Sequence, residues 1–133
     1  MKRIVVEFDG KAFDAMLFDD QAPVICGNIW NALPLEGPVT NTKWSGDMLR
    51  LWVEIPEPVE RENLSQLQNP GDILFLHKWN GLRFVYGQAR MQGPSGASPT
   101  PLVGRMLGGV EDLAALGKRV EWEGAVRLRV RRA

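Results

Sequence analysis

The stretch NTKWSGDMLRLWVE, residues 41–54, places two tryptophans and an arginine in a segment that has the alternation of a β-strand. Successive side chains of a strand point to opposite faces of its sheet, so Leu49, Leu51 and Val53 are expected to share one side. The opposite side would carry Met48, Arg50, Trp52 and Glu54. The aliphatic face indicates a strand that contributes to a core. The aromatic and charged face is typical of a binding surface.

The composition favours one soluble globular domain. The chain has 133 residues, of which 44% are hydrophobic and 24% are charged, as expected for a domain with a single modest core. Sixteen basic and sixteen acidic residues give a formal net charge of zero, so no general attraction to nucleic acid or to an anionic membrane is expected. The arginines of Arg127–Arg132 alternate with apolar residues and are interpreted as a solvated strand face.

The cysteine and histidine counts limit the chemistry. Cys26 is the only cysteine and His77 the only histidine, so neither an intrachain disulfide nor a rich His/Cys metal site is expected. The apolar run near the N-terminus is too short for a signal peptide, and no apolar stretch approaches membrane-spanning length. The sequence therefore predicts a cytoplasmic protein with no metal, no other cofactor, and no nucleic-acid or membrane partner.

Short strands and two short helices account for most of the chain. Lys2–Phe8 and Ala12–Leu17 flank Asp9-Gly10, a dipeptide typical of tight hairpin turns. Pro23–Leu33 is predicted to be a helix, because acidic residues precede it and proline occupies its first position. Cys26 is interpreted as a small core residue of this helix rather than a nucleophile.

A second hairpin is predicted in the middle of the chain. Asp72–Trp79 and Leu82–Tyr86 flank Asn80-Gly81, the preferred pair for a type I′ turn. Such a two-residue turn would pair Phe75 with Tyr86 and place both on one side of the sheet. By the same register His77 would face an aromatic patch, where the absence of a nearby orienting carboxylate favours a structural role.

The last part of the chain is predicted to contain a loop, a helix and two strands. Met91–Pro101 is rich in Gly, Pro and Ser and is expected to be a mobile surface loop. Val110–Leu116 is predicted to be a short helix stopped by Gly117. Lys118–Trp122 and Ala125–Val130 are predicted to form a final pair of strands. Together these elements favour a mainly β domain over residues 1–133, a small closed or nearly closed β-barrel with two short helices.

Four segments carry a recognisable pattern, in chain order: DDQAPVICGNIWNALPLEGPV, KWSGDML, RENLSQLQNPGDILF and FVYGQARMQGPSGASPTPLVGRMLGGVEDLAAL. Their most specific pieces are the helix start, the Pro-Gly-Asp entry to a strand and the Tyr-Gly segment before the loop. Together the four segments resemble the small bacterial cyclophilin-like families of unknown function, over about Ile4 to about Val130. The resemblance implies a cyclophilin-like barrel whose ligand groove lies on the outer face of the sheet, under its loops.

The match to peptidyl-prolyl isomerases of this fold is partial. Those enzymes carry an arginine just after a histidine, followed by a Phe-x-x-Gln-Gly-Gly segment. The equivalent place here reads TKWSGD, with Lys43 near the position of that arginine. Because lysine lacks the fixed fork of donors of a guanidinium, peptidyl-prolyl isomerase is the weakest of the functions considered.

Within the implied groove, Trp44, Arg50 and Trp52 are candidate ligand-binding residues, because tryptophan beside arginine is typical of binding anchors. In the alternative interpretation the long polar loop covers Trp52, and Arg50 forms a surface ion pair with Glu54 that contributes little energy. Both interpretations stay open at this point.

Four more residues are candidate members of the groove. Tyr86 would present its hydroxyl to a ligand, or else cap the core. Arg90, next to a loop, suits an anion such as a carboxylate, or else it is a solvated side chain. Glu62 and Asn63 match an E-N pair of the families and would orient a substrate amide; otherwise they cap a turn and face solvent.

Three functions follow from these residues. The first is a groove that binds a carboxylate- or amide-bearing metabolite, or carries out a simple isomerase or hydrolase step on it. The second is a non-catalytic module that binds a protein or peptide, or forms a homo-oligomer, through its aromatic surface. The third is peptidyl-prolyl isomerisation.

Overall fold

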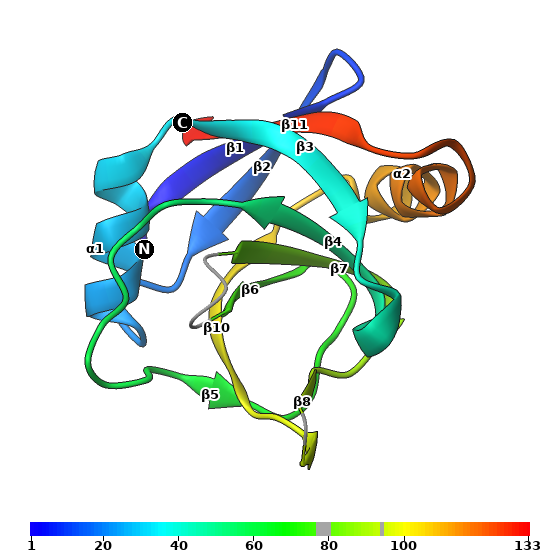
Figure 1. The fold of residues 1–133 in the computed structure, drawn as a ribbon. Coiled ribbons are helices and arrows are strands. Elements are labelled where there is room, and N and C mark those ends of the chain that lie inside the picture. The colour runs from blue at the N-terminus through cyan, green and yellow to red at the C-terminus, as the bar shows by residue number, and fades with distance from the viewer. Residues whose placement is uncertain (77–80, 94) are drawn as a thin grey trace.

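Eight strands close into an antiparallel barrel in the order β2-β1-β11-β3-β4-β7-β6-β10, and β10 pairs back to β2 (Figure 1). The computed structural model describes residues 1–76, 81–93 and 95–133. Two α-helices in the described residues lie at opposite sides of the barrel in Figure 1. The predicted closed, mainly β barrel with two helices is confirmed.

The bounds of the elements locate the site described below. The strands of the barrel are β1 (Arg3–Phe8), β2 (Lys11–Leu17), β3 (Leu35–Asn41), β4 (Gly46–Trp52), β6 (Asp72–Leu76), β7 (Gly81–Ala89), β10 (Thr100–Met106) and β11 (Val126–Arg132). The helices are α1 (Pro23–Ala32), α2 (Val110–Glu123) and the 3₁₀ turn η1 (Lys43–Ser45). Short β5 (Leu64–Ser65) pairs with β10, and β8 (Gln92–Gly93) pairs with β9 (Gly96–Ala97).

The first hairpin forms as its turn residues predict. Asp9 and Gly10 both have positive φ, at 53° and 69°, which is the conformation that a type I′ turn requires. Phe8 pairs with Lys11 directly across the turn. The dipeptide therefore sets the register of β1 against β2.

The aliphatic side of the opening stretch lies inside the barrel, as its alternation predicts. Leu49, Leu51 and Val53 are all buried in the main core. Met48 on the opposite side is also buried, in a second apolar cluster with Leu74, Val85 and Met91. The segment after β7 folds over this outer face, so the sheet is covered on both sides here.

Residues 41–54 do not form the single strand that the alternation suggested. β3 ends at Asn41, η1 follows, and β4 begins at Gly46 with φ 95°. A Cβ at Gly46 would lie 2.6 Å from the carbonyl oxygen of Gln88, so the chain turns here only with glycine. As a result Trp44 lies on η1 and not on the strand of Trp52.

The predicted two-residue turn of the second hairpin is wrong. Gly81 belongs to β7 and pairs with Leu76, while Phe75 pairs with Leu82 rather than with Tyr86. His77 and Asn80, with the rest of residues 77–80, lie outside the described residues. The register differs from the predicted one by an even number of residues, so Phe75 and Tyr86 still share one side of the sheet, as predicted, and that side faces the core.

The predicted stop of the late helix is also wrong. α2 continues through Gly117 to Glu123, so residues 118–122 are helical and not a strand. Gly117 packs directly against the ring of Tyr86, and a Cβ at this position would overlap that ring. The glycine is required for packing between α2 and β7, and Gly124, with φ 94°, follows the helix end.

The segment predicted as a mobile surface loop contains ordered structure. β8 and β9 pair within it, and Met91 at its start is buried in the second apolar cluster. Thr100 at its other end is buried and already belongs to β10. The segment is therefore attached to the outer face of the sheet at both ends.

Two helical glycines give a matched test of this packing. Gly117→Ala is expected to lower the free energy of unfolding by about 1–3 kcal/mol, because the added methyl group overpacks against Tyr86. Gly27→Ala, in α1 with nothing within 4 Å of its Cβ position, is expected to raise it by about 0.4–1 kcal/mol. Chemical denaturation of both variants measures the difference, and equal effects would contradict the packing role of Gly117.

Candidate functional site

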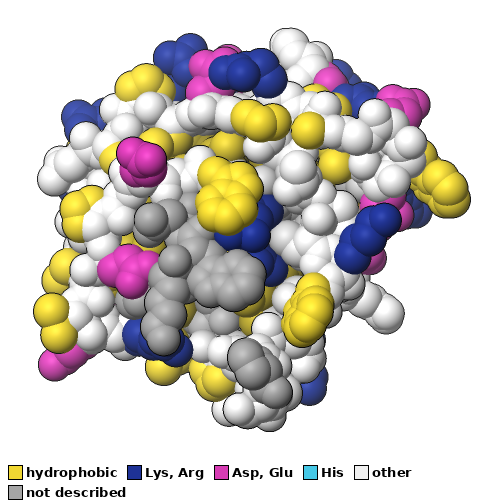
Figure 2. All heavy atoms as spheres, viewed as in Figure 1, with side chains coloured by type: hydrophobic (Ala, Val, Ile, Leu, Met, Phe, Trp, Pro, Cys, Tyr) yellow, Lys and Arg dark blue, Asp and Glu magenta, His cyan; other side chains and the backbone are white. Residues whose placement is uncertain are grey.

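A cavity of about 500 Å³ lies against the outer face of β4 and β7. Its walls come from residues 40–42, 44 and 45, from one residue each of β4, β6 and β7, from Arg61, and from residues 91–93 and 98–101. On the face shown in Figure 2, Lys and Arg side chains lie next to hydrophobic side chains near the centre. The cavity has the size of a small-molecule site.

Two arginines stand side by side on the wall of this cavity. Arg50 and Arg83 are direct partners in the β4–β7 register, and both line the cavity. Like charges directly opposite each other on neighbouring strands destabilise a sheet. Burial lowers the pKa of Arg83 to about 10, and the positive charge of Arg50 acts in the same direction. Burial also lowers the pKa of Arg50.

Arg83 is a buried cation with weak partners. Its residue is 6% exposed, and its Nη1 lies 3.5 Å from Ser45 Oγ and 3.6 Å from Met91 Sδ. Its Nε is buried without a hydrogen bond, and no ion pair joins Arg83 to a carboxylate among the described residues. Because arginine is almost never fully buried unless it is paired, this guanidinium indicates a place for an anion.

A hydroxyl group on the cavity wall is also buried without a hydrogen-bond partner. Thr42 Oγ1 is buried and makes no hydrogen bond within the part of the chain that the structure describes. Thr42 and Ser45 both line the cavity, on either side of Trp44. The wall therefore combines guanidinium and hydroxyl groups with apolar surface from residues such as Met91 and Leu76.

Two of the three residues predicted from the opening stretch line this cavity. Trp44 and Arg50 line it, and Trp44 is 77% exposed. Trp52 does not line it and is 59% exposed. The guanidinium of Arg50 lies 3.4 Å from the ring centroid of Trp52, a cation–π stack. Trp52 thus supports Arg50 from the solvent side.

Glu62 contacts the start of α1 rather than the cavity. Its two carboxylate oxygens accept hydrogen bonds from the backbone N–H groups of Val24, at 3.1 Å, and Ile25, at 2.8 Å. These are among the N–H groups that a helix leaves without partners, and a negative charge there is favourable. The helix has no side-chain cap of its own, so Glu62 supplies the cap from a distant loop.

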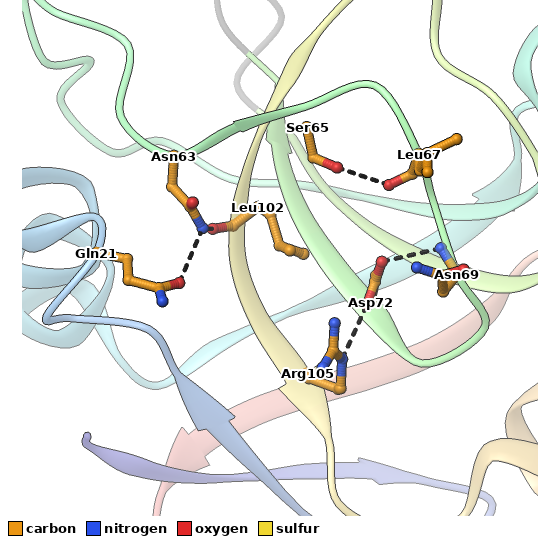
Figure 3. A network of polar contacts seen from close by, with 8 residues as sticks. All are labelled: Gln21, Asn63, Ser65, Leu67, Asn69, Asp72, Leu102 and Arg105. Atoms are coloured by element: carbon orange, nitrogen blue, oxygen red, sulfur yellow. Dashed lines mark hydrogen bonds and ion pairs between the residues drawn. The ribbon is translucent and has the colours of Figure 1, made fainter.

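Asn63 ties the same loop to the barrel. Its backbone has a positive φ of 48°, and its Nδ2 donates to the carbonyl oxygens of Leu102, at 2.8 Å, and of the Gln21 side chain, at 3.3 Å (Figure 3). Leu102 N–H in turn donates to Asn63 O. The figure also shows buried Asp72 bound to Arg105 and to the backbone of Asn69, which holds the neighbouring turn.

Tyr86 lies on the other side of the sheet from the two arginines. It is buried against α2, and its hydroxyl donates to Glu121 Oε1 at 2.7 Å and accepts a hydrogen bond from Asn41 Nδ2. Burial, with the neighbouring Glu121, raises the pKa of Tyr86. A smaller hollow of about 350 Å³ adjoins Asn41, Glu121 and Trp122. Arg90 is exposed and lines neither cavity.

Arg83 and Arg61 are site residues that the sequence reasoning did not single out. The alternation in GLRFVY does place Arg83 on the side opposite Leu82 and Phe84. An arginine within so apolar a strand was the available signal. Its significance depends on Arg50, which becomes its neighbour only through the pairing of β4 with β7. Arg61, within a polar run, carried no such signal.

The remaining sequence predictions concern Cys26, metal ions and membranes. Cys26 is buried in the core, its Sγ donates to the carbonyl oxygen of Val103, and burial raises the pKa of its thiol to about 12. Within residues 1–76, 81–93 and 95–133, no cluster of three or more His, Cys, Asp or Glu side chains is arranged to hold a metal ion. Neither described helix has the length and apolar character needed to span a bilayer.

The solved structures that match this fold include McbB and AF2241. The structure of McbB in complex with tryptophan matches with a TM-score of 0.77 and 21% identity, over 97% of this chain and 44% of McbB. The chain therefore spans less than half the length of McbB. The solution structure of the hypothetical protein AF2241 from Archaeoglobus fulgidus matches with a TM-score of 0.68 and 18% identity, over 99% of this chain and 95% of AF2241.

Sequence comparison gives a family but no characterised relative. No curated protein matches the chain. The resemblance to cyclophilin-like families stays a prediction, since the matching structures support a small barrel without that assignment. One family model matches residues 4–131, nearly the whole chain. The chain belongs to the family described as protein of unknown function (DUF3830).

Proposed function

We propose that this protein binds a small carboxylate-bearing molecule in the cavity lined by Arg50 and Arg83. The observation that carries the proposal is Arg83, a buried guanidinium on the cavity wall with no carboxylate partner among the described residues. A carboxylate accepts two parallel hydrogen bonds from a guanidinium fork. It would also reduce the repulsion between the two neighbouring arginines.

The walls support binding of an organic anion rather than an inorganic one. Trp44, Met91 and Leu76 line the cavity together with the arginines, and small-molecule sites combine such apolar surface with a few directed polar groups. McbB, on a related barrel, was solved with tryptophan, which itself carries a carboxylate. This is consistent with small-molecule binding on the fold.

The proposed site includes only part of the residues predicted from the sequence. Trp44 and Arg50 would contact the ligand, and Trp52 would hold Arg50 in place through their stacked contact. Tyr86 and Arg90 are not included, because neither lines this cavity. The functional groups on the described wall bind and orient an anion, so the proposal concerns binding and assigns no catalytic step.

The alternative of a protein-binding or self-associating surface draws on exposed tryptophans. Trp44, Trp52 and Trp122 are 77%, 59% and 88% exposed. Two of these three already have a place at the cavity, as a wall and as a support for Arg50. The alternative predicts concentration-dependent association that is lost in Trp122→Ala, whereas the proposed site is independent of that residue.

Calorimetric titration with matched carboxylates and their amides tests the proposal. An aromatic or aliphatic monocarboxylate is expected to bind at least about tenfold more tightly than its amide, because only the carboxylate forms charge-assisted hydrogen bonds. Arg83→Met is expected to abolish this preference, at a cost of about 1.5–3 kcal/mol in binding. Arg90→Met, which removes an exposed arginine outside the cavity, serves as the control. Unchanged carboxylate binding by Arg83→Met would refute the proposal.

The same substitution should not destabilise the ligand-free protein. The pKa of Arg83 in the fold, about 10, lies below its ordinary value, so below pH 10 the fold carries a charge that it disfavours. Arg83→Met removes that charge and keeps the length of the side chain, so the free energy of unfolding is expected to stay unchanged or to rise by about 1–4 kcal/mol. Thermal unfolding at neutral pH measures this. A clear loss of stability would show that Arg83 serves packing instead.

A further inference from the structure

Three guanidinium groups line the cavity, and two of them, those of Arg83 and Arg61, have no carboxylate partner among the described residues. Arg50 and Arg83 come from neighbouring strands, and Arg61 comes from the long connection between β4 and β5. No Asp or Glu is present among the described residues of the cavity wall. The positive charges of Arg83 and Arg61 therefore exceed what a single acidic group neutralises.

The three arginines occupy two different environments. Arg83 is nearly inaccessible and lies beside Arg50 on the sheet, whereas Arg61 is exposed. Since Arg61 lines the same cavity while facing solvent, it stands at the mouth and the strand pair stands at the inner wall. A ligand that reaches from one to the other would present an acidic group at each end.

Arg61 is held at the mouth by its sequence neighbours. Glu62 is fixed by its hydrogen bonds to the first turn of α1, and Asn63 is fixed to β10 through Leu102. Glu62, one of the two carboxylates adjacent to Arg61 in sequence, is therefore engaged by a helix. The other, Glu60, is exposed and does not line the cavity. Arg61 itself makes no hydrogen bond or ion pair with the part of the chain that the structure describes.

We propose, on the basis of the function proposed above, that Arg61 forms a second anion position and that the favoured ligands are dicarboxylates. One carboxylate lies at Arg50 and Arg83, and the other lies at Arg61. Glu62 and Asn63, which the sequence suggested as ligand-binding residues, act here as positioning residues. They hold the loop so that Arg61 faces the cavity.

Titration with dicarboxylates and matched monocarboxylates tests this inference. Succinate, glutarate and adipate are compared with butyrate, valerate and hexanoate, so that each pair shares its chain length. The best dicarboxylate is expected to bind the wild-type protein about tenfold more tightly than its monocarboxylate partner. Arg61→Gln is expected to remove this preference and to leave monocarboxylate affinity within about twofold. Arg61→Lys, which keeps the charge, should restore part of it.

Glu62→Gln tests whether Glu62 positions Arg61 without contacting the ligand. It weakens the contact with α1 while leaving every residue of the cavity wall unchanged, so it is expected to reduce the dicarboxylate preference only. Arg90→Gln, which removes an exposed arginine outside the cavity, is expected to change neither affinity. Thermal unfolding of each variant verifies that the fold is retained.

The outcomes of these titrations test the second anion position separately from the proposed function. If monocarboxylates bind and require Arg83, but dicarboxylates show no advantage that depends on Arg61, the second anion position is overturned and the proposed function stands. If neither class binds the wild-type protein, or if Arg83→Met binds both classes normally, the proposed function fails and this inference fails with it.

Discussion

The antiparallel pairing of β4 with β7 is the constraint on which the rest of the structure depends. It sets Leu51 opposite Leu82 on the inner face and Arg50 opposite Arg83 on the outer face. A shift of one residue in either strand would exchange the two faces. The main core would then receive a guanidinium, and the cavity would lose one. The same register therefore builds both the core and the charged wall.

The outer face of this strand pair carries both apolar and positively charged side chains. Met48, Leu74, Val85 and Met91 form a second apolar cluster there, and buried Arg83 lies beside partly exposed Arg50 on the same face. Met91 attaches the start of the segment after β7 to the sheet through this cluster, and it contacts the buried guanidinium of Arg83. A buried charge without a full partner is costly. The barrel tolerates that cost because its main core extends around all of its strands.

The long connection after β4 gains its order from contacts far away in sequence. Glu62 completes the first turn of α1, and Asn63 bonds to β10. Each contact satisfies backbone groups that would otherwise lack partners. Because both attachments lie next to Arg61, a segment with little secondary structure of its own still presents a side chain to the cavity in a defined place.

Local patterns in the sequence determined the features that depend on neighbouring residues. Alternation identified the inner face of β4, Asp9-Gly10 specified the first turn, and proline marked the start of α1, since each pattern acts within a few residues. These were enough to predict a closed mainly β barrel. Trp44 and Arg50, both predicted as ligand-binding residues, line one cavity, and their role in binding stays a prediction.

Only the tertiary structure decided the features that depend on distant partners. Gly117 resembled a helix stop until Tyr86 was seen to occupy the space of its missing side chain. Glu62 resembled a groove residue until α1 was seen to need its carboxylate. The position of Arg83 became informative only with Arg50 beside it across the sheet and with Met91 in contact with its guanidinium. The alternation of a strand predicts which side chains share a face. Which strand pairs beside that face, and which segment packs over it, are determined by contacts between residues far apart in sequence.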